Sequence, residues 1–370
     1  MTTSRFIIID TDTKLHNLRK ILMSKDTLAL DMEFHAENRY LPKLMLIQLA
    51  DLDKNIWIVD PIAIDISSLS SVLKNKIFLT HGGQEDIRLL YAHLSVTPQK
   101  IFDTQIAAAF TGIHYPARLN TLLEKSLQQK VMQHETLSDW SKRPLKSQQL
   151  QYAAEDVSSL VDLYTHYQSI LGDQEAWVWE ASKEMLHSSL NRTIEEWRSW
   201  KVVQQFDNTT KNILVSLLNW REETAQRKNK PANYILPRNI IIDLVRRKPK
   251  SIQEIRLNRR INHGLIKNHG QEILAMIAKG RRSTHRWPTI QYSDIAREKL
   301  ILAWSTCFSE SCGIASDLIM PANLAQRIAQ HGVCELTGWR RKMLHDDLVD
   351  FLNGTTAIGL QNNVPQIVAK

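Results

Sequence analysis

Apolar and polar residues follow two different patterns along the chain, and the change falls near residue 209. Before that point, short alternating or apolar runs predict strands over residues 6–9, 27–34, 44–50, 56–59 and 77–80. Apolar residues at helical spacing predict helices over residues 84–93, 104–110, 119–128 and 147–170. The polar stretch from Asp51 to Asn55 indicates a turn, so we expect residues 44–59 to form a hairpin. Strands that precede most of the helices predict a mixed sheet flanked by helices.

The strand signal disappears after residue 209, where short helical patterns are separated by Pro and Gly. A chain of 370 residues exceeds the size at which one core keeps growing, so several domains are expected. We therefore predict an α/β domain over residues 1–170, a helical connector over 171–208, and two small all-α domains over 209–285 and 290–368.

Positive charge is concentrated in one of these segments. The formal net charge is +8, yet residues 201–300 alone hold 21 Lys and Arg against 8 Asp and Glu. Residues 301–370 hold 5 basic against 6 acidic side chains. A basic module beside nearly neutral neighbours indicates a polyanionic partner, most often nucleic acid, although a solvated basic surface gives the same composition.

Two acids interrupt the predicted strand Leu-Ala-Leu-Asp-Met-Glu-Phe at residues 28–34. Successive side chains of a strand point to opposite faces, so Asp31 and Glu33 emerge side by side. A sheet tolerates such a pair if the strand is an exposed edge or if a cation lies between the carboxylates.

Three further residues add to this pair. Asp86 follows a Gly-Gly junction after the strand at 77–80, which places it in the first turn of a helix, where an acid is also ordinary dipole complementarity. Tyr152 and Asp156 are four residues apart and share one helix face, as a surface tyrosine and a solvated acid also do.

Together, Asp31, Glu33, Asp86 and Asp156 supply the oxygen ligands that Mg²⁺ and Mn²⁺ prefer. Two such ions about 3.5 to 4 Å apart activate an attacking water and stabilise a leaving alkoxide in phosphodiester cleavage. Cations at this position would also explain why the strand carries two adjacent acids.

The ordered motifs DMEFH, HGGQED, IFDTQIAA and YAAEDVSSLVDLY resemble those of the DEDD superfamily of 3′-5′ exonucleases, in its tyrosine-containing branch. Nearly the whole chain is similar to the bacterial ribonuclease D family, in which tandem HRDC domains follow the exonuclease domain. The segments DWSKRPL at 139–145, WREE at 220–223 and LTGWR at 336–340 contribute to this resemblance. It implies an RNase H-like α/β domain followed by two all-α HRDC-like domains.

The resemblance assigns Asp31, Glu33, Asp86 and Asp156 to two divalent ions, with Asp31 shared by both, and Tyr152 to the attacking water. It implies an exoribonuclease that releases nucleoside 5′-monophosphates and matures tRNA precursors and other small stable RNAs. The expected substrate is RNA with a single-stranded 3′ end, bound by a monomer in the cytoplasm and without a membrane segment.

The roles of two neighbouring residues stay open. Asp103 either supports the acid site or caps the helix that follows it. His81 is expected to be a packed residue at the strand-helix junction rather than part of the site.

The sequence departs from the family at residues 133–137, QHETL, where basic residues are expected. If those residues contact RNA, the preference for substrates differs here. Two rival functions remain at this point, a 3′-5′ DNA exonuclease and a catalytically inactive RNA-binding scaffold.

Overall fold

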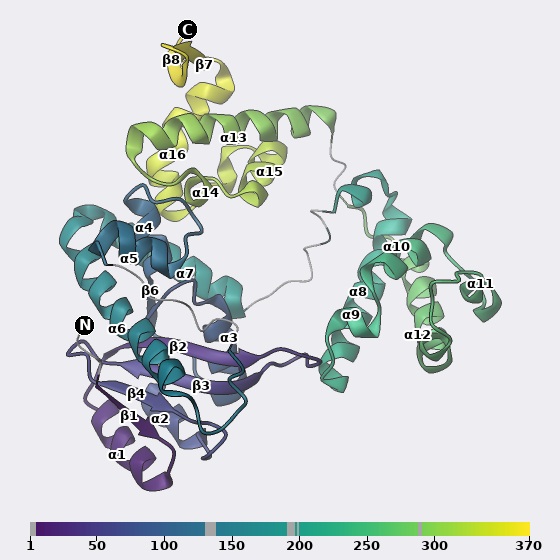
Figure 1. The fold of residues 1–370 in the computed structure, drawn as a ribbon. Coiled ribbons are helices and arrows are strands. Elements are labelled where there is room, and N and C mark those ends of the chain that lie inside the picture. Colours follow the sequence, from purple (N-terminus) through teal and green to yellow (C-terminus); the bar gives the residue numbers. More distant parts are fainter. Residues whose placement is uncertain (1–4, 130–137, 191–196, 198–199, 288–290) are drawn as a thin grey trace. The chain divides into compact units, whose positions relative to one another are not determined.

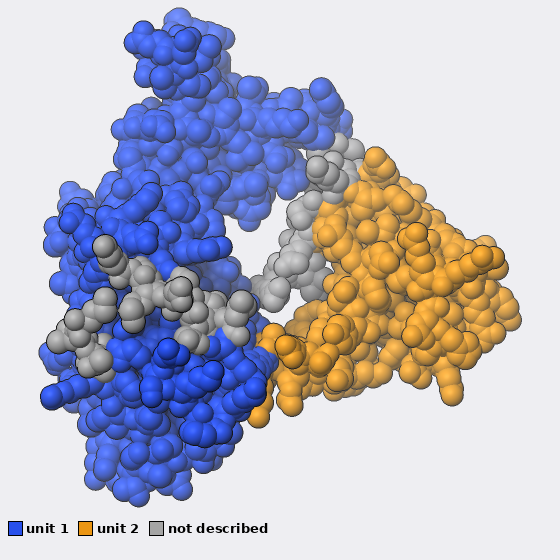
Figure 2. Space-filling view, in the orientation of Figure 1, with its two compact units in different colours: residues 1–35, 44–191, 291–370 blue, residues 36–43, 192–290 orange. Residues whose placement is uncertain are grey.

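The computed structural model describes residues 5–129, 138–190, 197, 200–287 and 291–370, and its elements are labelled in Figure 1. These residues divide into two compact units, coloured separately in Figure 2. The first contains residues 1–35, 44–191 and 291–370, and the second contains residues 36–43 and 192–290. Among the described residues, no helix is long and apolar enough to cross a membrane.

A six-stranded mixed sheet forms the base of the first unit. Its strands are β1 (Phe6–Ile9), β2 (Thr27–His35), β3 (Lys43–Ala50), β4 (Ile56–Val59), β5 (Ile77–Thr80) and β6 (Lys100–Asp103). The order across the sheet is β1-β4-β3-β2-β5-β6. β3 and β4 pair antiparallel, which confirms the predicted hairpin, whereas β2, β5 and β6 pair in parallel. The catalytic candidates on β2 therefore lie on a central strand.

The helices of the N-terminal part are α1 (Asp12–Leu22), α2 (Ser70–Leu73), α3 (Gln84–Leu94), α4 (Thr104–Phe110), α5 (Leu119–Leu127), α6 (Ser147–Ile170) and α7 (Glu175–Leu190), with short 3₁₀ turns η1 (Ser67–Leu69) and η2 (Gly172–Gln174). The long helix α6 contacts β2, β4 and β5 and so lies against the sheet (Figure 1). Helix α7 contacts β6, α3 and α4, so part of the predicted connector packs into the first unit.

The C-terminal part of the first unit consists of α13 (Tyr292–Cys312), α14 (Ser316–Ile319), α15 (Ala322–His331), η5 (Val333–Glu335), α16 (Gly338–Asn353), β7 (Thr356–Gln361) and β8 (Val364–Ala369). β7 and β8 form an antiparallel hairpin, so the expectation of helices alone after residue 209 is wrong here. Both turn residues, Asn362 and Asn363, have positive φ angles of 52° and 64°. Asparagine tolerates this conformation, which two-residue hairpin turns require.

The segment LTGWR packs this C-terminal part onto the N-terminal helices. Trp339 is fully buried and its ring lies 4.9 Å from that of Phe110 and 6.3 Å from that of Trp177, between centroids. Arg340 donates to Glu184 at 2.5 Å and to the carbonyl of Leu318. The role of this segment in the structure is packing.

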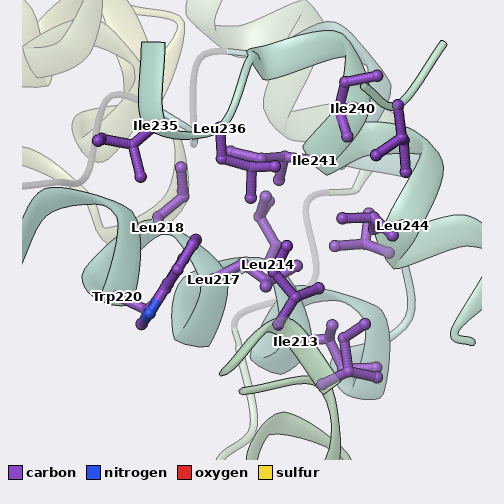
Figure 3. Packing of buried hydrophobic residues seen from close by; sticks show 14 of the residues in the cluster. Ile213, Leu214, Leu217, Leu218, Trp220, Ile235, Leu236, Ile240, Ile241 and Leu244 are labelled. Carbon is purple, nitrogen blue, oxygen red and sulfur yellow. The ribbon is translucent and has the colours of Figure 1, made fainter. Parts of the chain in front are cut away.

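The second unit contains η4 (Lys201–Gln205), α8 (Asn208–Lys228), α9 (Ala232–Ile235), α10 (Arg238–Arg247), α11 (Ile252–Arg256) and α12 (His263–Arg282). Leu214 and Leu217 of α8 share its apolar core with Leu236 and with Ile241 and Leu244 of α10 (Figure 3). This cluster gives the basic segment a core of its own.

Residues 36–43, which link β2 to β3, belong to the second unit and are held there by hydrogen bonds. The Tyr40 hydroxyl donates to Glu222 at 2.5 Å and accepts from the Gln226 amide at 2.9 Å. The Leu41 backbone N–H donates to Asn229 Oδ1 at 3.0 Å.

Candidate active site

β2 places Asp31 and Glu33 on one face of the sheet, as the strand period of two predicts. Leu30 and Met32, which point to the opposite face, are buried with exposed fractions of 1% and 4%. β3 and β5 flank β2 in the sheet, so β2 is a central strand, and its pairing with β5 covers Thr27–Ala29, just before the two acids. An edge position of the whole strand therefore does not explain the pair, and a cation between the two carboxylates agrees with this placement.

Asp156 on α6 joins this pair across the interface between the helix and the sheet. Carboxylate oxygens of Asp31, Glu33 and Asp156 all lie within 4.8 Å of one another. The long helix reaches this position because α6 packs on β2, which brings a residue from far along the chain over the strand. Three carboxylates at this separation offer a set of hard oxygen donors suited to a divalent ion.

Asp86 lies in the first turn of α3, outside the group of three but within its electrostatic reach. Burial and then the charge of Asp31 raise the pKa of Asp86, and the charge of Asp86 adds to the effect of burial on the pKa of Glu33. The structure thus brings three of the four predicted acids together and places the fourth beside them.

Burial and mutual repulsion shift the pKa of every acid in the site upward. Burial, followed by the charges of Asp31, Asp156 and Asp86, raises the pKa of Glu33 to about 9. Burial raises the pKa of Asp31 to about 7, and burial with the charge of Asp31 raises the pKa values of Asp86 and Asp156 well above their ordinary range. Without a bound cation the ionised cluster is therefore unfavourable. This is the electrostatic character of a cation site.

Tyr152 lies one helical turn before Asp156, and its hydroxyl forms a hydrogen bond with the Asp156 carboxylate. This bond offsets part of the rise in the pKa of Asp156 that burial and the charge of Asp31 cause. The ring centroid of Trp140 lies 6.3 Å from that of Tyr152, with 40° between the ring planes. Trp140 comes from the segment DWSKRPL, whose part in the site is not predicted from the sequence.

Asp103 caps α4 and also supports the start of α3. Its Oδ1 accepts from the backbone N–H groups of Gln105 and Ile106 at 3.0 and 3.2 Å, which is the helix-capping role. Its Oδ2 accepts from the Thr80 hydroxyl at 2.9 Å and from the Gly83 N–H at 3.1 Å. Because Gly83 directly precedes the helix that carries Asp86, one buried carboxylate connects β5, α3 and α4.

Gly83 leaves no room for a larger residue at this junction, because an added Cβ would lie 2.5 Å from the Thr80 side chain. His81 at the same junction is partly buried, and its ring nitrogens lie 3.0 Å from the Thr104 hydroxyl and 3.0 Å from the Ala117 carbonyl. These contacts agree with the packing role expected for His81. The departure from the family at residues 133–137 lies outside the described residues.

Comparisons with known proteins agree with this arrangement. Residues 6–171 match the 3′-5′ exonuclease family and residues 211–277 match the HRDC domain. Ribonuclease D of Pseudomonas paraeruginosa is 26% identical over 345 residues, which cover 88% of this chain and 92% of that protein. Ribonuclease D of Desulfotalea psychrophila is 27% identical over 363 residues, covering 92% and 96%.

A crystal structure of Escherichia coli RNase D, described as an exoribonuclease involved in structured RNA processing, has the same fold. The TM-score is 0.81 at 23% identity, with 95% of this chain and 99% of that chain covered. The sheet, the acids and the two family matches define a 3′-5′ exonuclease of the DEDD type joined to an HRDC domain. Along nearly its whole length the chain is similar to ribonuclease D.

Proposed function

We propose that this chain is a metal-dependent 3′-5′ exoribonuclease that removes nucleoside 5′-monophosphates from RNA. One observation carries the proposal. Three carboxylates of the 3′-5′ exonuclease domain lie within 4.8 Å of one another, and one of them is hydrogen-bonded to the Tyr152 hydroxyl. Relatives along nearly the full length of the chain are named ribonuclease D, which supports RNA over DNA as the substrate.

The donor set of the site fits divalent cations. In the proposal, Asp31, Glu33 and Asp156 hold Mg²⁺ or Mn²⁺, and Asp86 beside them contributes to a second ion. When bound, such ions supply the charge that lowers the pKa of an attacking water and stabilises the leaving alkoxide. The raised pKa values of the acids support this assignment, because a cation removes the repulsion that causes part of the shift.

The residues of the chain orient the reactants. Water adds to the phosphorus of the terminal phosphodiester and the P–O3′ bond breaks. The shortened RNA keeps O3′ as its new 3′-hydroxyl, and the released nucleotide keeps its phosphate on the 5′ oxygen. The Tyr152 hydroxyl, held by Asp156, is placed to orient this water by a hydrogen bond. A group positioned in this way contributes about 10² to 10⁴-fold to the rate.

The second unit is the proposed RNA-binding module. Its HRDC domain lies within residues 201–300, which hold 21 basic against 8 acidic side chains. The C-terminal part, residues 290–368, is proposed as a second HRDC-like domain, and the division into 1–170, 171–208, 209–285 and 290–368 stays a prediction. With 5 basic and 6 acidic side chains over 301–370, this last part contributes shape and packing rather than phosphate contacts.

The proposed substrates are RNAs with single-stranded 3′ ends, especially tRNA precursors, processed by a monomer in the cytoplasm. The test is incubation of the purified chain with a 3′-extended tRNA precursor, with and without Mg²⁺, and products read at nucleotide resolution. Stepwise shortening from the 3′ end that requires Mg²⁺ supports the proposal. Cleavage of matched RNA and DNA oligonucleotides, measured in parallel, decides which of the two backbones is the substrate. If neither is cleaved in the presence of metal, the result favours the alternative of a catalytically inactive RNA-binding scaffold.

A further inference from the structure

Arg143, in the segment DWSKRPL, makes an extended set of polar contacts near the site. Its Nε and Nη2 donate to the two carboxylate oxygens of Asp60 at 2.5 and 2.8 Å. Nη2 also donates to the Met45 carbonyl at 2.9 Å, and Nη1 donates to the carbonyls of Trp140 and Lys142 at 2.8 and 2.9 Å. All five N–H groups of a guanidinium are thereby used.

These contacts attach the loop before α6 to the sheet. Met45 lies on β3, next to the strand that carries the acids, and Asp60 directly follows β4. The Asp60 side chain has an exposed fraction of only 8%, and its Oδ1 also accepts from the Ile62 N–H at 2.9 Å. A bidentate Arg-carboxylate pair with fixed partners on both sides has one geometry, which a lysine cannot reproduce.

The loop held in this way carries Trp140, which lies against the ring of Tyr152. Trp140 is 3% exposed, so its position is set by its surroundings and not by solvent. Its carbonyl is one of the groups bound by Arg143, and the ring centroids of Trp140 and Tyr152 lie 6.3 Å apart. At the start of α6, Gln149 accepts from the Lys146 N–H at 3.0 Å, which fixes the first turn of the helix that carries Tyr152.

We propose that Arg143 is a positioning residue for the reaction: through Trp140 it fixes the ring of Tyr152, so that the hydroxyl stays on the Asp156 carboxylate and oriented toward the attacking water. This inference rests on the proposed function and adds a residue that acts through Trp140 and Tyr152. A misplacement of about 1 Å far from the chemistry costs up to ~10²-fold in rate, so the effect of such a residue is large enough to measure.

Arg143→Lys is the direct test, since lysine keeps the positive charge but cannot make the set of hydrogen bonds that the guanidinium makes. The expected result is a fall in kcat of about 10-fold or more with little change in KM for RNA or in the Mg²⁺ requirement. In the Tyr152→Phe background the same substitution is expected to add nothing, because the hydroxyl it positions is already gone. This non-additivity distinguishes a positioning role from a general loss of structure. With a general loss of structure, the fold-losses in kcat from the two substitutions would multiply in the double variant.

Lys54→Met is the matched control. Lys54 forms an ion pair with Asp162, which ties the turn between β3 and β4 to the same helix α6, about 15 Å along it from Tyr152. Its expected kcat equals that of the unchanged protein. If Arg143→Lys does not fold by circular dichroism, Trp140→Phe replaces it, with the same expected loss and the same non-additivity with Tyr152→Phe.

Two failures are distinguishable. If the unchanged protein shows no metal-dependent cleavage of RNA, the proposed function is overturned. The positioning role alone is overturned if the unchanged protein is active and either of two results is found. In the first, a folded Arg143→Lys variant has the same kcat as the unchanged protein. In the second, the losses from Arg143→Lys and Tyr152→Phe multiply in the double variant.

Discussion

The Tyr152 hydroxyl is hydrogen-bonded to the carboxylate of Asp156, four residues later on the same helix. This contact joins a neutral donor to an acid that also lies within 4.8 Å of Asp31 and Glu33. Because α6 is a regular helix here, the spacing of four fixes the two side chains on one face. The side chains of Tyr152 and Asp156 are therefore positioned together at the acid site by one helix.

Tyr152→Phe is predicted to reduce the rate of RNA cleavage by roughly 10²-fold or more, because it keeps the ring but removes the water-orienting hydroxyl. RNA affinity is expected to change little, since the packing of the ring against Trp140 is retained. Single-turnover kinetics with excess enzyme measure the chemical step, and a binding titration measures affinity. A variant that binds RNA weakly yet cleaves bound RNA at the normal rate would identify Tyr152 as a stacking contact instead.

Replacement of Asp31 or Asp156 by Ala is predicted to abolish cleavage without unfolding the protein. Each substitution removes one member of a repulsive cluster, so the thermal midpoint in EDTA is expected to stay level or rise. Calorimetry or circular dichroism melts, with and without Mg²⁺, provide the measurement. Near-normal cleavage by either variant would exclude that residue from the site.

The metal-free protein is predicted to lose stability as the pH rises from about 4 to about 9. The pKa values of Asp31 and Glu33 rise to about 7 and about 9 in the folded state, from ordinary values of 3.8 and 4.5. Between these limits the folded state binds more protons than the unfolded state, so the free energy of unfolding falls with pH. A tenfold change in the acid dissociation constant corresponds to about 1.4 kcal/mol, so urea titrations in EDTA at several pH values detect the effect.

Glu33→Gln is the control for this pH dependence, since it removes the group with the highest pKa and keeps a similar shape. The variant is expected to lose less stability than the unchanged protein between pH 6 and pH 9. If the free energy of unfolding depends on pH in the same way in both proteins, Glu33 is ionised in the metal-free state and its pKa is not raised.

Asp103→Asn is predicted to destabilise the protein by about 1 to 3 kcal/mol and to reduce cleavage. The amide keeps one oxygen for the cap of α4 but turns an NH₂ group toward the Gly83 N–H, which loses its acceptor. Asp207→Asn at the exposed cap of α8 is the matched control, because Asn and Asp cap helices equally well. Denaturant unfolding of both variants decides, and equal stabilities would contradict the connecting role of Asp103.

Local features of the site are predictable from the sequence, and its long-range contacts are not. The strand period of two is enough to place Asp31 and Glu33 on one face, and helical spacing does the same for Tyr152 and Asp156. The approach of α6 to β2 depends on packing between segments far apart in the chain, which one sequence does not encode locally. Only the resemblance to a family joins the two pairs.

Two of the missed elements, β6 and the hairpin β7–β8, have local reasons. β6 is only four residues long and begins with an exposed lysine, so it gives almost no periodic signal. The hairpin β7–β8 is detectable from its Asn-Asn turn, but the surrounding helical pattern outweighs it. The contact of Arg143 with Asp60 spans 83 residues and leaves no trace in the spacing of either residue.

The salt dependence of RNA affinity is predicted to arise mainly from the basic second unit. Arg256, Arg259 and Lys267 are exposed there, and cations that neutralise phosphates release counterions. Replacing all three by Gln is expected to flatten the slope of log affinity against log salt by up to about 2, at roughly 0.7 per contacted phosphate of a single strand. The titration uses an Asp31→Ala background so that the RNA survives.

A charge-matched triple variant in the C-terminal part separates this effect from a general loss of positive charge. Lys299, Arg341 and Lys342 are also exposed, and their replacement by Gln removes the same three charges. Because residues 291–370 hold 7 basic against 8 acidic side chains, no basic surface is concentrated there, and the slope is expected to stay nearly unchanged. If both triple variants flatten the slope equally, RNA affinity depends only on the total charge of the protein. An unchanged slope in the first triple would move phosphate recognition away from these three residues of the second unit.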